Sequence, residues 1–129
     1  YAVHFAAKKG YHICIITGGK CNSIRIRFQE LGINDIFIAS KDKRDDFQTF
    51  LTKYNLSKDE VLYMGDDLPD LLVMKQAGIS ACPSDAVPEI MEIADYISNK
   101  RSGEGCVRDV VEQTLKLQGK WADSDAFVW

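Results

Sequence analysis

Three carboxylates follow closely after an apolar segment of this sequence. Asp66 and Asp67 are adjacent, and Asp70 comes shortly after them. Two adjacent carboxylates repel each other unless a cation lies between them or water screens them. Magnesium prefers such hard oxygen ligands, and it accepts one or two carboxylates while it keeps several waters. We therefore expect a magnesium site at Asp66, Asp67 and Asp70, with Gly65 allowing a tight backbone turn before them.

Helix capping is the alternative interpretation of these acids. Asp67 can cap a helix that has Pro69 in its first turn, and Asp70 can lie near the positive end of that helix. Capping accounts for one or two of the three acids but not for all three, so the sequence favours the metal site.

Two further polar groups follow other apolar segments. Thr17-Gly18-Gly19 offers a hydroxyl and backbone N–H groups, which suit a phosphate. Lys43 offers a compact positive charge suited to a phosphoryl oxygen. Taken alone, the first is an ordinary turn between strand and helix and the second is a solvated lysine. Together with the aspartates, however, they predict a site for phosphate and magnesium.

These groups meet only if the segments before them are neighbouring strands. Short apolar runs predict strands at 12–17, 36–39, 61–64, 79–82 and 96–98. Helical periodicity predicts helices at 1–9, 22–31, 44–54, 69–77, 87–94 and 106–118. Such alternation is typical of a Rossmann-like α/β fold, an open parallel sheet with helices on both faces, in a single domain. Ligands of such sheets bind beyond the carboxyl ends of the strands.

Composition narrows the function classes. The chain has 129 residues and a formal charge of −3, which argues against nucleic acid as the main partner. No apolar run approaches the roughly 20 residues that cross a bilayer, so we expect no membrane span. The four cysteines form no C-x-x-C pair, which argues against a zinc cluster and suits a reducing cytoplasm.

The order threonine, lysine, paired aspartates resembles the haloacid dehalogenase superfamily of phosphatases. Its second, third and fourth motifs look like IITGG around Thr17, KDK ending at Lys43, and GDDLPD from Gly65 to Asp70. Within it, the sequence is most similar to the small, capless branch that acts on 3-deoxy-D-manno-octulosonate 8-phosphate. Supporting stretches are RFQELGI (27–33), GDDLPDLLVMKQAG (65–78), DAVPEIMEIADYIS (85–98) and GEGCVRDVVE (103–112).

The resemblance implies magnesium-dependent hydrolysis of a sugar-acid phosphate through an aspartyl-phosphate, in lipopolysaccharide synthesis. It implies that residues 1–120 form the phosphatase core. Thr17 and the backbone after it would hydrogen-bond the phosphoryl group, and Lys43 would neutralise it. Asp66 would bind magnesium directly, while Asp67 and Asp70 would tune or orient that site.

The resemblance also implies substrate contacts at His4, Gly18, Gly19 and Arg27. The loop of Gly103, Glu104 and Gly105 before the last helix can contact a ligand, cap that helix, or do both. The family assembles as a tetramer in which a neighbour's tail closes each site. The aromatic tail 121–129, with Trp121, Phe127 and Trp129, would suit such a contact, or else packing within its own domain.

The sequence departs from the family at its first motif. No Asp-x-Asp-Gly occurs in the chain, although this motif carries the family's nucleophile. Because the chain does not begin with Met, we expect it to begin after that motif and to be inactive as written. His4 and Gly19 also stand where the family usually has arginine.

Three alternatives remain open at this point. The substrate can be another sugar acid, such as a nonulosonate 9-phosphate. The chain can be a phosphate-accepting receiver domain, although the acidic pair of a receiver comes first in the chain and here it comes last. It can also be a non-catalytic assembly module, which would not need Thr17, Lys43 and Asp66 together.

Overall fold

The computed structural model describes residues 1–127, and its helices and strands alternate along the chain. The strands are β1 (Cys14–Ile16), β2 (Asp35–Phe37), β3 (Leu62–Met64), β4 (Ile79–Cys82) and β5 (Tyr96–Ile97). The α-helices are α1 (Ala2–Lys8), α2 (Asn22–Glu30), α3 (Lys43–Tyr54), α4 (Leu71–Met74), α5 (Pro88–Ile93) and α6 (Cys106–Leu117). Short 3-10 helices are η1 (Lys58–Glu60), η2 (Leu68–Asp70) and η3 (Ser124–Phe127). The predicted strand and helix order is confirmed.

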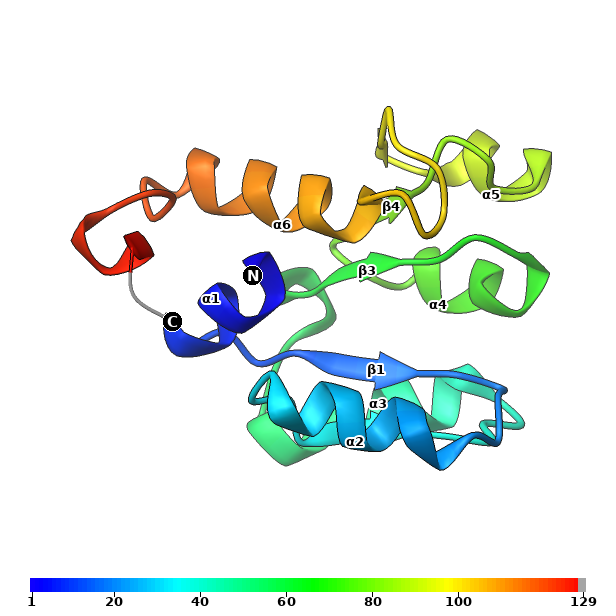
Figure 1. Cartoon of the computed structure of the whole chain (residues 1–129). Helices are drawn as coiled ribbons and strands as arrows, with labels where there is room; N and C mark the ends of the chain where they lie inside the picture. The colour runs from blue at the N-terminus through cyan, green and yellow to red at the C-terminus, as the bar shows by residue number, and fades with distance from the viewer. Residues whose placement is uncertain (128–129) are drawn as a thin grey trace.

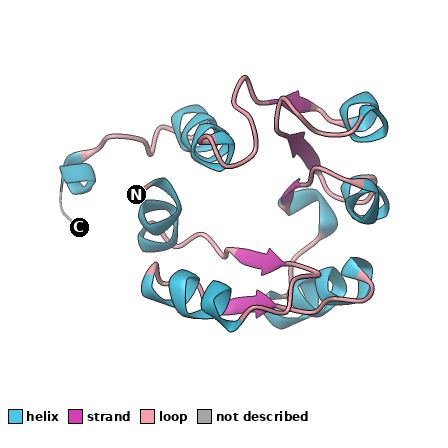
Figure 2. Ribbon diagram, turned by 45° about the vertical axis from the view of Figure 1, so that its right-hand side comes forward, coloured by secondary structure: helices cyan, strands magenta, loops and turns pink. Residues whose placement is uncertain are grey.

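The strands form two parallel sheets, whereas the sequence predicted one. β1 pairs with β2, and β3 pairs with β4, which pairs with β5. Figure 1 shows the arrows of β1 and β3 pointing the same way, and Figure 2 shows the strands in two separate groups. The predicted Rossmann-like fold of parallel strands and helices is confirmed, but no strand of the described residues lies between β1 and β3 to join the two sheets by hydrogen bonds.

Helices cover both faces of the strands, as predicted. Phe5 and Ala6 of α1 pack against Leu115 of α6. A second cluster packs Phe47 of α3 against Val73 of α4. Figure 1 shows α2 in front of β1 and α3 behind it. Helices on both faces therefore hold the strands in place, while the polar loops that follow the strands stay exposed.

Local signals define the ends of α3 and η1. The Asp42 carboxylate accepts a hydrogen bond from the Arg44 backbone N–H at 2.9 Å, so it caps the N-terminus of α3. Asn55 ends the helix in the left-handed region with a φ of 51°. Ser57 and Glu60 form a capping box at η1, as a serine followed three residues later by a glutamate often does.

The helix predicted over 69–77 is shorter and begins differently. Its start is the 3-10 turn η2, and only Leu71–Met74 is α-helical. Asp67 caps η2, because its side chain accepts a hydrogen bond from the Leu68 backbone N–H at 2.7 Å. The capping interpretation is therefore correct for Asp67.

The aromatic tail packs in part against its own chain. The Trp121 ring lies edge-on to Tyr1 and Phe5, at centroid distances of 6.2 and 5.9 Å. Lys9 also pairs with Asp123 at 2.5 Å. Trp121 is thus held within the chain, whereas Phe127 is 84% exposed. The predicted role of Trp129 falls outside the described residues. Among residues 1–127, no helix has the length and apolar character needed to span a membrane.

Candidate active site

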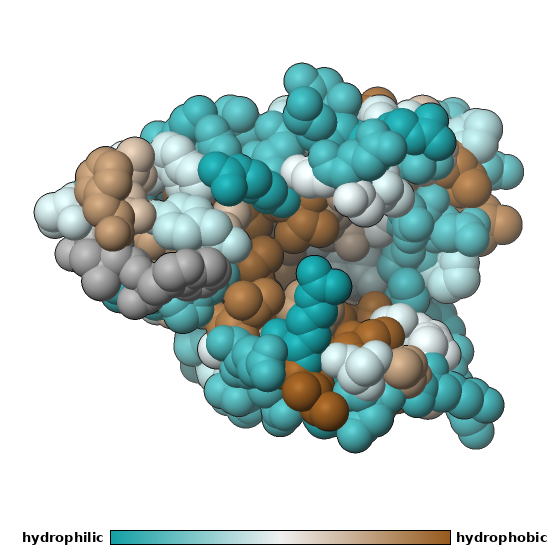
Figure 3. Space-filling model, viewed as in Figure 1, coloured by the Kyte–Doolittle hydropathy of each residue, from teal (hydrophilic) through white to brown (hydrophobic). Residues whose placement is uncertain are grey.

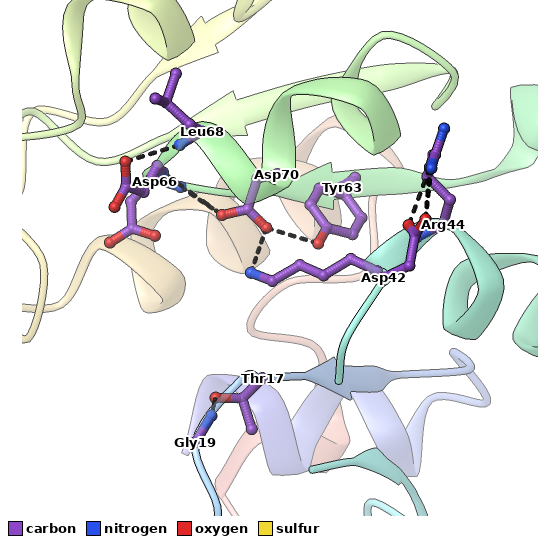
Figure 4. Close-up of polar contacts among 10 residues, drawn as sticks. Thr17, Gly19, Asp42, Arg44, Tyr63, Asp66, Leu68 and Asp70 are labelled. Atoms are coloured by element: carbon purple, nitrogen blue, oxygen red, sulfur yellow. Dashed lines mark hydrogen bonds and ion pairs between the residues drawn. The ribbon is translucent and has the colours of Figure 1, made fainter. Parts of the chain in front are cut away.

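The predicted site residues follow the carboxyl ends of three parallel strands. Thr17 follows β1, Lys43 lies beyond β2 at the start of α3, and Asp66 follows β3. All three therefore lie at the same edge of the strands. Figure 4 places Thr17 on one side of the space between the sheets and Asp66 on the other.

The Thr17 loop is held by backbone hydrogen bonds from the loop after β2. Ser40 N–H donates to the Thr17 carbonyl at 3.0 Å, and Ala39 N–H donates to the Gly19 carbonyl at 2.9 Å. Gly19 N–H donates to Thr17 Oγ1 at 3.1 Å, so this oxygen already accepts one hydrogen bond and its own hydroxyl remains a donor. The hydroxyl oxygen of Ser40 is buried and has no partner within residues 1–127.

Lys43 and Asp70 form a buried ion pair. Lys43 Nζ lies 2.6 Å from Asp70 Oδ1, and the two side chains are 17% and 3% exposed. Tyr63 donates its hydroxyl to the same oxygen at 2.8 Å. The other oxygen of Asp70 accepts longer hydrogen bonds from the backbone N–H groups of Asp66 and Asp67, at 3.3 and 3.5 Å. Asp70 therefore joins the lysine to the loop that carries the aspartate pair.

The three carboxylates predicted to form the magnesium site point to different partners, so their joint role as metal ligands stays a prediction. Within residues 1–127 no three histidine, cysteine, aspartate or glutamate side chains are grouped to hold a metal. Asp70 is 2% exposed and is occupied by Lys43 and Tyr63, while Asp67 caps η2. Asp66 is exposed, and its carboxylate makes no hydrogen bond to any described residue. It is thus the remaining candidate ligand of the three.

Burial and neighbouring charge determine the protonation of two side chains near this edge. Burial, followed by the nearby charge of Asp70, strongly raises the pKa of Tyr63, so its hydroxyl stays protonated and donates. The hydrogen bond from the Arg44 guanidinium lowers the pKa of Asp42 to about 2. The Asp42 cap of α3 is therefore charged at neutral pH.

A cavity of about 600 Å³ lies along α2 and is also lined by residues of α1 and α6. Its lining includes Ser23, Ile24 and Arg27 of α2, Tyr1, and Arg108 of α6. Figure 3 shows a hollow in the molecular surface with apolar residues inside it. Arg27 makes no hydrogen bond or ion pair to any described residue, so its guanidinium can meet an anion.

The other predicted substrate contacts lie in different places. His4 Nδ1 is 3.2 Å from the Leu31 carbonyl, at the end of α2 away from the Thr17 loop. Gly103 and Gly105 have φ values of +75° and +98°, and Gly105 directly precedes α6. Glu104 lies between them and is exposed. Their roles in substrate binding stay predictions.

Two residues near the site are not among the predicted site residues: Tyr63, which contacts Asp70, and Arg108, which lines the cavity. A signal existed for Tyr63: a hydroxyl at the end of a buried strand needs a partner, and the nearest acceptor in the sequence is the aspartate loop.

Comparisons with known proteins agree on the kind of protein. A family model described as haloacid dehalogenase-like hydrolase matches residues 19–109. The chain is 34% identical over 120 residues to the 3-deoxy-D-manno-octulosonate 8-phosphate phosphatase of Escherichia coli K12. That match covers 93% of this chain and 64% of the relative, so the chain spans less than two thirds of the relative's length.

Solved structures show the same fold. The 3-deoxy-D-manno-octulosonate 8-phosphate phosphatase of Yersinia pestis superposes with a TM-score of 0.91 at 31% identity, covering 93% of this chain and 65% of that one. The phosphatase of the same kind from Moraxella catarrhalis, solved with magnesium ion, phosphate ion and KDO, gives a TM-score of 0.90 at 31% identity. That match covers 93% of this chain and 69% of the other.

Proposed function

Because the chain belongs to the haloacid dehalogenase-like hydrolases, we propose that it forms part of a magnesium-dependent phosphatase of sugar-acid phosphates. The substrate that its relatives favour is 3-deoxy-D-manno-octulosonate 8-phosphate, which would yield the free sugar acid and phosphate. The observation that carries the proposal is the buried Lys43–Asp70 pair, held beside Asp66 at the carboxyl edge. Membership of this hydrolase family argues against the two alternatives of a receiver domain and an assembly module.

Each residue at the edge has a role in this reaction. Thr17 donates its hydroxyl to a phosphoryl oxygen, and the exposed Gly18 N–H adds a second donor. Lys43 keeps its ammonium at the edge through Asp70 and balances the phosphoryl charge. Arg27 meets the anionic end of the sugar acid from the cavity.

Asp66 is the residue that would hold magnesium. Its exposed carboxylate suits an ion that takes one or two carboxylates and completes its shell with water and substrate oxygens. The Ser40 hydroxyl beside the Thr17 loop is buried and finds no partner in the part of the chain that the structure describes, so it fits a ligand at this edge. Bound magnesium would neutralise charge on the phosphoryl oxygens during transfer.

We also propose that residues 1–120 are one core that takes a further parallel strand between β1 and β3. The arrows of these two strands point the same way in Figure 1, and both strands consist of apolar residues that are only half-buried. Such a strand would end between Thr17 and Asp66, where the family's first motif would supply the attacking aspartate. The 129 residues contain no Asp-x-Asp-Gly, so under this proposal turnover depends on the added strand. The assembly would be a cytoplasmic tetramer, as the resemblance implies.

The experiment measures phosphate release from 3-deoxy-D-manno-octulosonate 8-phosphate with magnesium. We expect none from the 129-residue chain alone, and release once it is fused to a segment that carries the Asp-x-Asp-Gly motif of the family. Asp66→Asn in the fusion should abolish turnover, whereas Glu89→Gln, an exposed carboxylate on α5, should not. A fusion that binds neither magnesium nor phosphate would refute the proposal. A nonulosonate 9-phosphate assayed in parallel separates the two substrates.

A further inference from the structure

We propose that Tyr63 is a positioning residue of this site: its hydroxyl fixes the Asp70 carboxylate so that Asp70 holds Lys43 and the Asp66 loop together. The inference rests on the proposed function, because it assigns the residue that orients the same site. Nothing in the family motifs quoted above includes Tyr63, which lies within β3.

The contacts at Asp70 divide between its two oxygens. Oδ1 accepts from Lys43 Nζ at 2.6 Å and from the Tyr63 hydroxyl at 2.8 Å. Oδ2 is left to the backbone N–H groups of Asp66 and Asp67. Two donors on one oxygen fix the rotation of the carboxylate, and that rotation aims the second oxygen at the loop. Without the tyrosine donor, a single flexible lysine would set the carboxylate plane.

The Tyr63 ring is held independently of its hydroxyl. It meets Phe47 edge-on at a centroid distance of 6.1 Å, and it packs against the buried clusters that contain Val73 and Met74. Its backbone pairs with Ser80 in β4. Phenylalanine would keep all of these contacts and remove only the hydrogen bond. Burial and Asp70 also raise the pKa of Tyr63, so the hydroxyl is a donor at every working pH.

A second lysine–aspartate–tyrosine set supplies a matched control. Lys53 lies 2.5 Å from Asp35 Oδ1, and the Tyr54 hydroxyl donates to Asp35 Oδ2. Each oxygen there has its own donor, and Asp35 opens β2 at the edge opposite to Thr17. Tyr54→Phe therefore removes an equivalent hydrogen bond away from the site.

The test compares Tyr63→Phe with Tyr54→Phe in two ways. In the 129-residue chain, NMR measures the backbone amide chemical shifts of Asp66 and Asp67. Tyr63→Phe should change these shifts, whereas Tyr54→Phe should leave them as in the parent. In the fusion, Tyr63→Phe should lower kcat at least tenfold with KM changed less than threefold, while Tyr54→Phe leaves kcat within twofold. The inference would be overturned if Tyr63→Phe left the amide chemical shifts of Asp66 and Asp67 unchanged and kept kcat within twofold of the parent.

Two further measurements cover a variant that does not fold and a fusion that is inactive. If Tyr63→Phe does not fold, 3-fluorotyrosine at position 63 is used instead, because it keeps the hydroxyl. It should preserve the amide chemical shifts of Asp66 and Asp67 in the parent, and changed shifts would contradict the role. If the parent fusion releases no phosphate, the proposed function fails. The NMR comparison then still decides whether Tyr63 positions the Asp66 loop.

Discussion

Lys43 Nζ lies 2.6 Å from Asp70 Oδ1, although 27 residues separate the two in the chain. Lys43→Met removes the ammonium and leaves a buried carboxylate with fewer donors. We expect it to lower the free energy of unfolding by about 2–3 kcal/mol, measured by urea unfolding. Lys41→Met, at an exposed position in the same loop, should change it by less than about 0.5 kcal/mol. Equal stability of the two variants would show that the pair contributes nothing.

Gly65 is required by the close approach of Asp70. A Cβ atom at position 65 would lie 2.4 Å from Asp70 Cβ and 2.6 Å from its Cγ. Gly65→Ala should therefore displace Asp70 and cost about 1–3 kcal/mol of stability. Gly18→Ala is the control, because its Cβ would meet only the Ser40 carbonyl oxygen, at 3.9 Å. Thermal unfolding checks both, and a Gly65→Ala protein as stable as Gly18→Ala would contradict the assigned packing.

The cysteines should differ in reactivity. Cys21 is exposed, and its hydrogen bond with Ser23 lowers its thiol pKa. Burial, followed by the charge of Asp35, raises the pKa of Cys14 to about 12, and burial also raises that of Cys82. Since the thiolate is the reacting form, a thiol reagent at pH 8 should modify Cys21 at least tenfold faster than Cys14 or Cys82.

Peptide mapping after timed labelling identifies the modified site. Cys21→Ser should remove the fast phase. Fast labelling of Cys14 in the folded protein would show that β1 is more open than the structure indicates.

The Asp42 cap predicts a pH-dependent contribution to stability. In the folded chain Arg44 lowers the Asp42 pKa to about 2, below the value of about 3.9 for an unfolded aspartate. A depressed pKa contributes stability that is present above pH ~4 and is lost as the pH falls towards 2. Asp42→Asn keeps a capping oxygen, so the difference in Tm between parent and variant should shrink between pH 5 and pH 2. A difference independent of pH would exclude the charge as its cause.

The order of elements could be predicted because apolar periodicity and helix caps are local signals. The strand at 79–82 and the cap at Asp67 agree with the structure, since each depends on adjacent residues. The break between the sheets could not be seen in this way. β1 and β3 look like any other pair of apolar strands until their neighbours are known.

The site was predicted in position but not in detail. Thr17, Lys43 and Asp66 lie at the expected edge because strand ends in a parallel fold converge there. The role of Asp70 depends on a lysine 27 residues earlier, which neither spacing nor periodicity reveals. Three carboxylates therefore resembled one metal site, although one is an ion-pair partner and another a cap.

The packing of α1 against α6 bears on the order in which the chain folds. Phe5 and Leu115 meet across more than a hundred intervening residues, and Tyr1 reaches Ala126 through its hydroxyl. Loop closure over such a distance is entropically costly until the intervening segments have condensed. We therefore expect the packing of α1 against α6 to form last on refolding and to open first on unfolding. Early protection of amides from hydrogen exchange should then concentrate in the β3–β4 region.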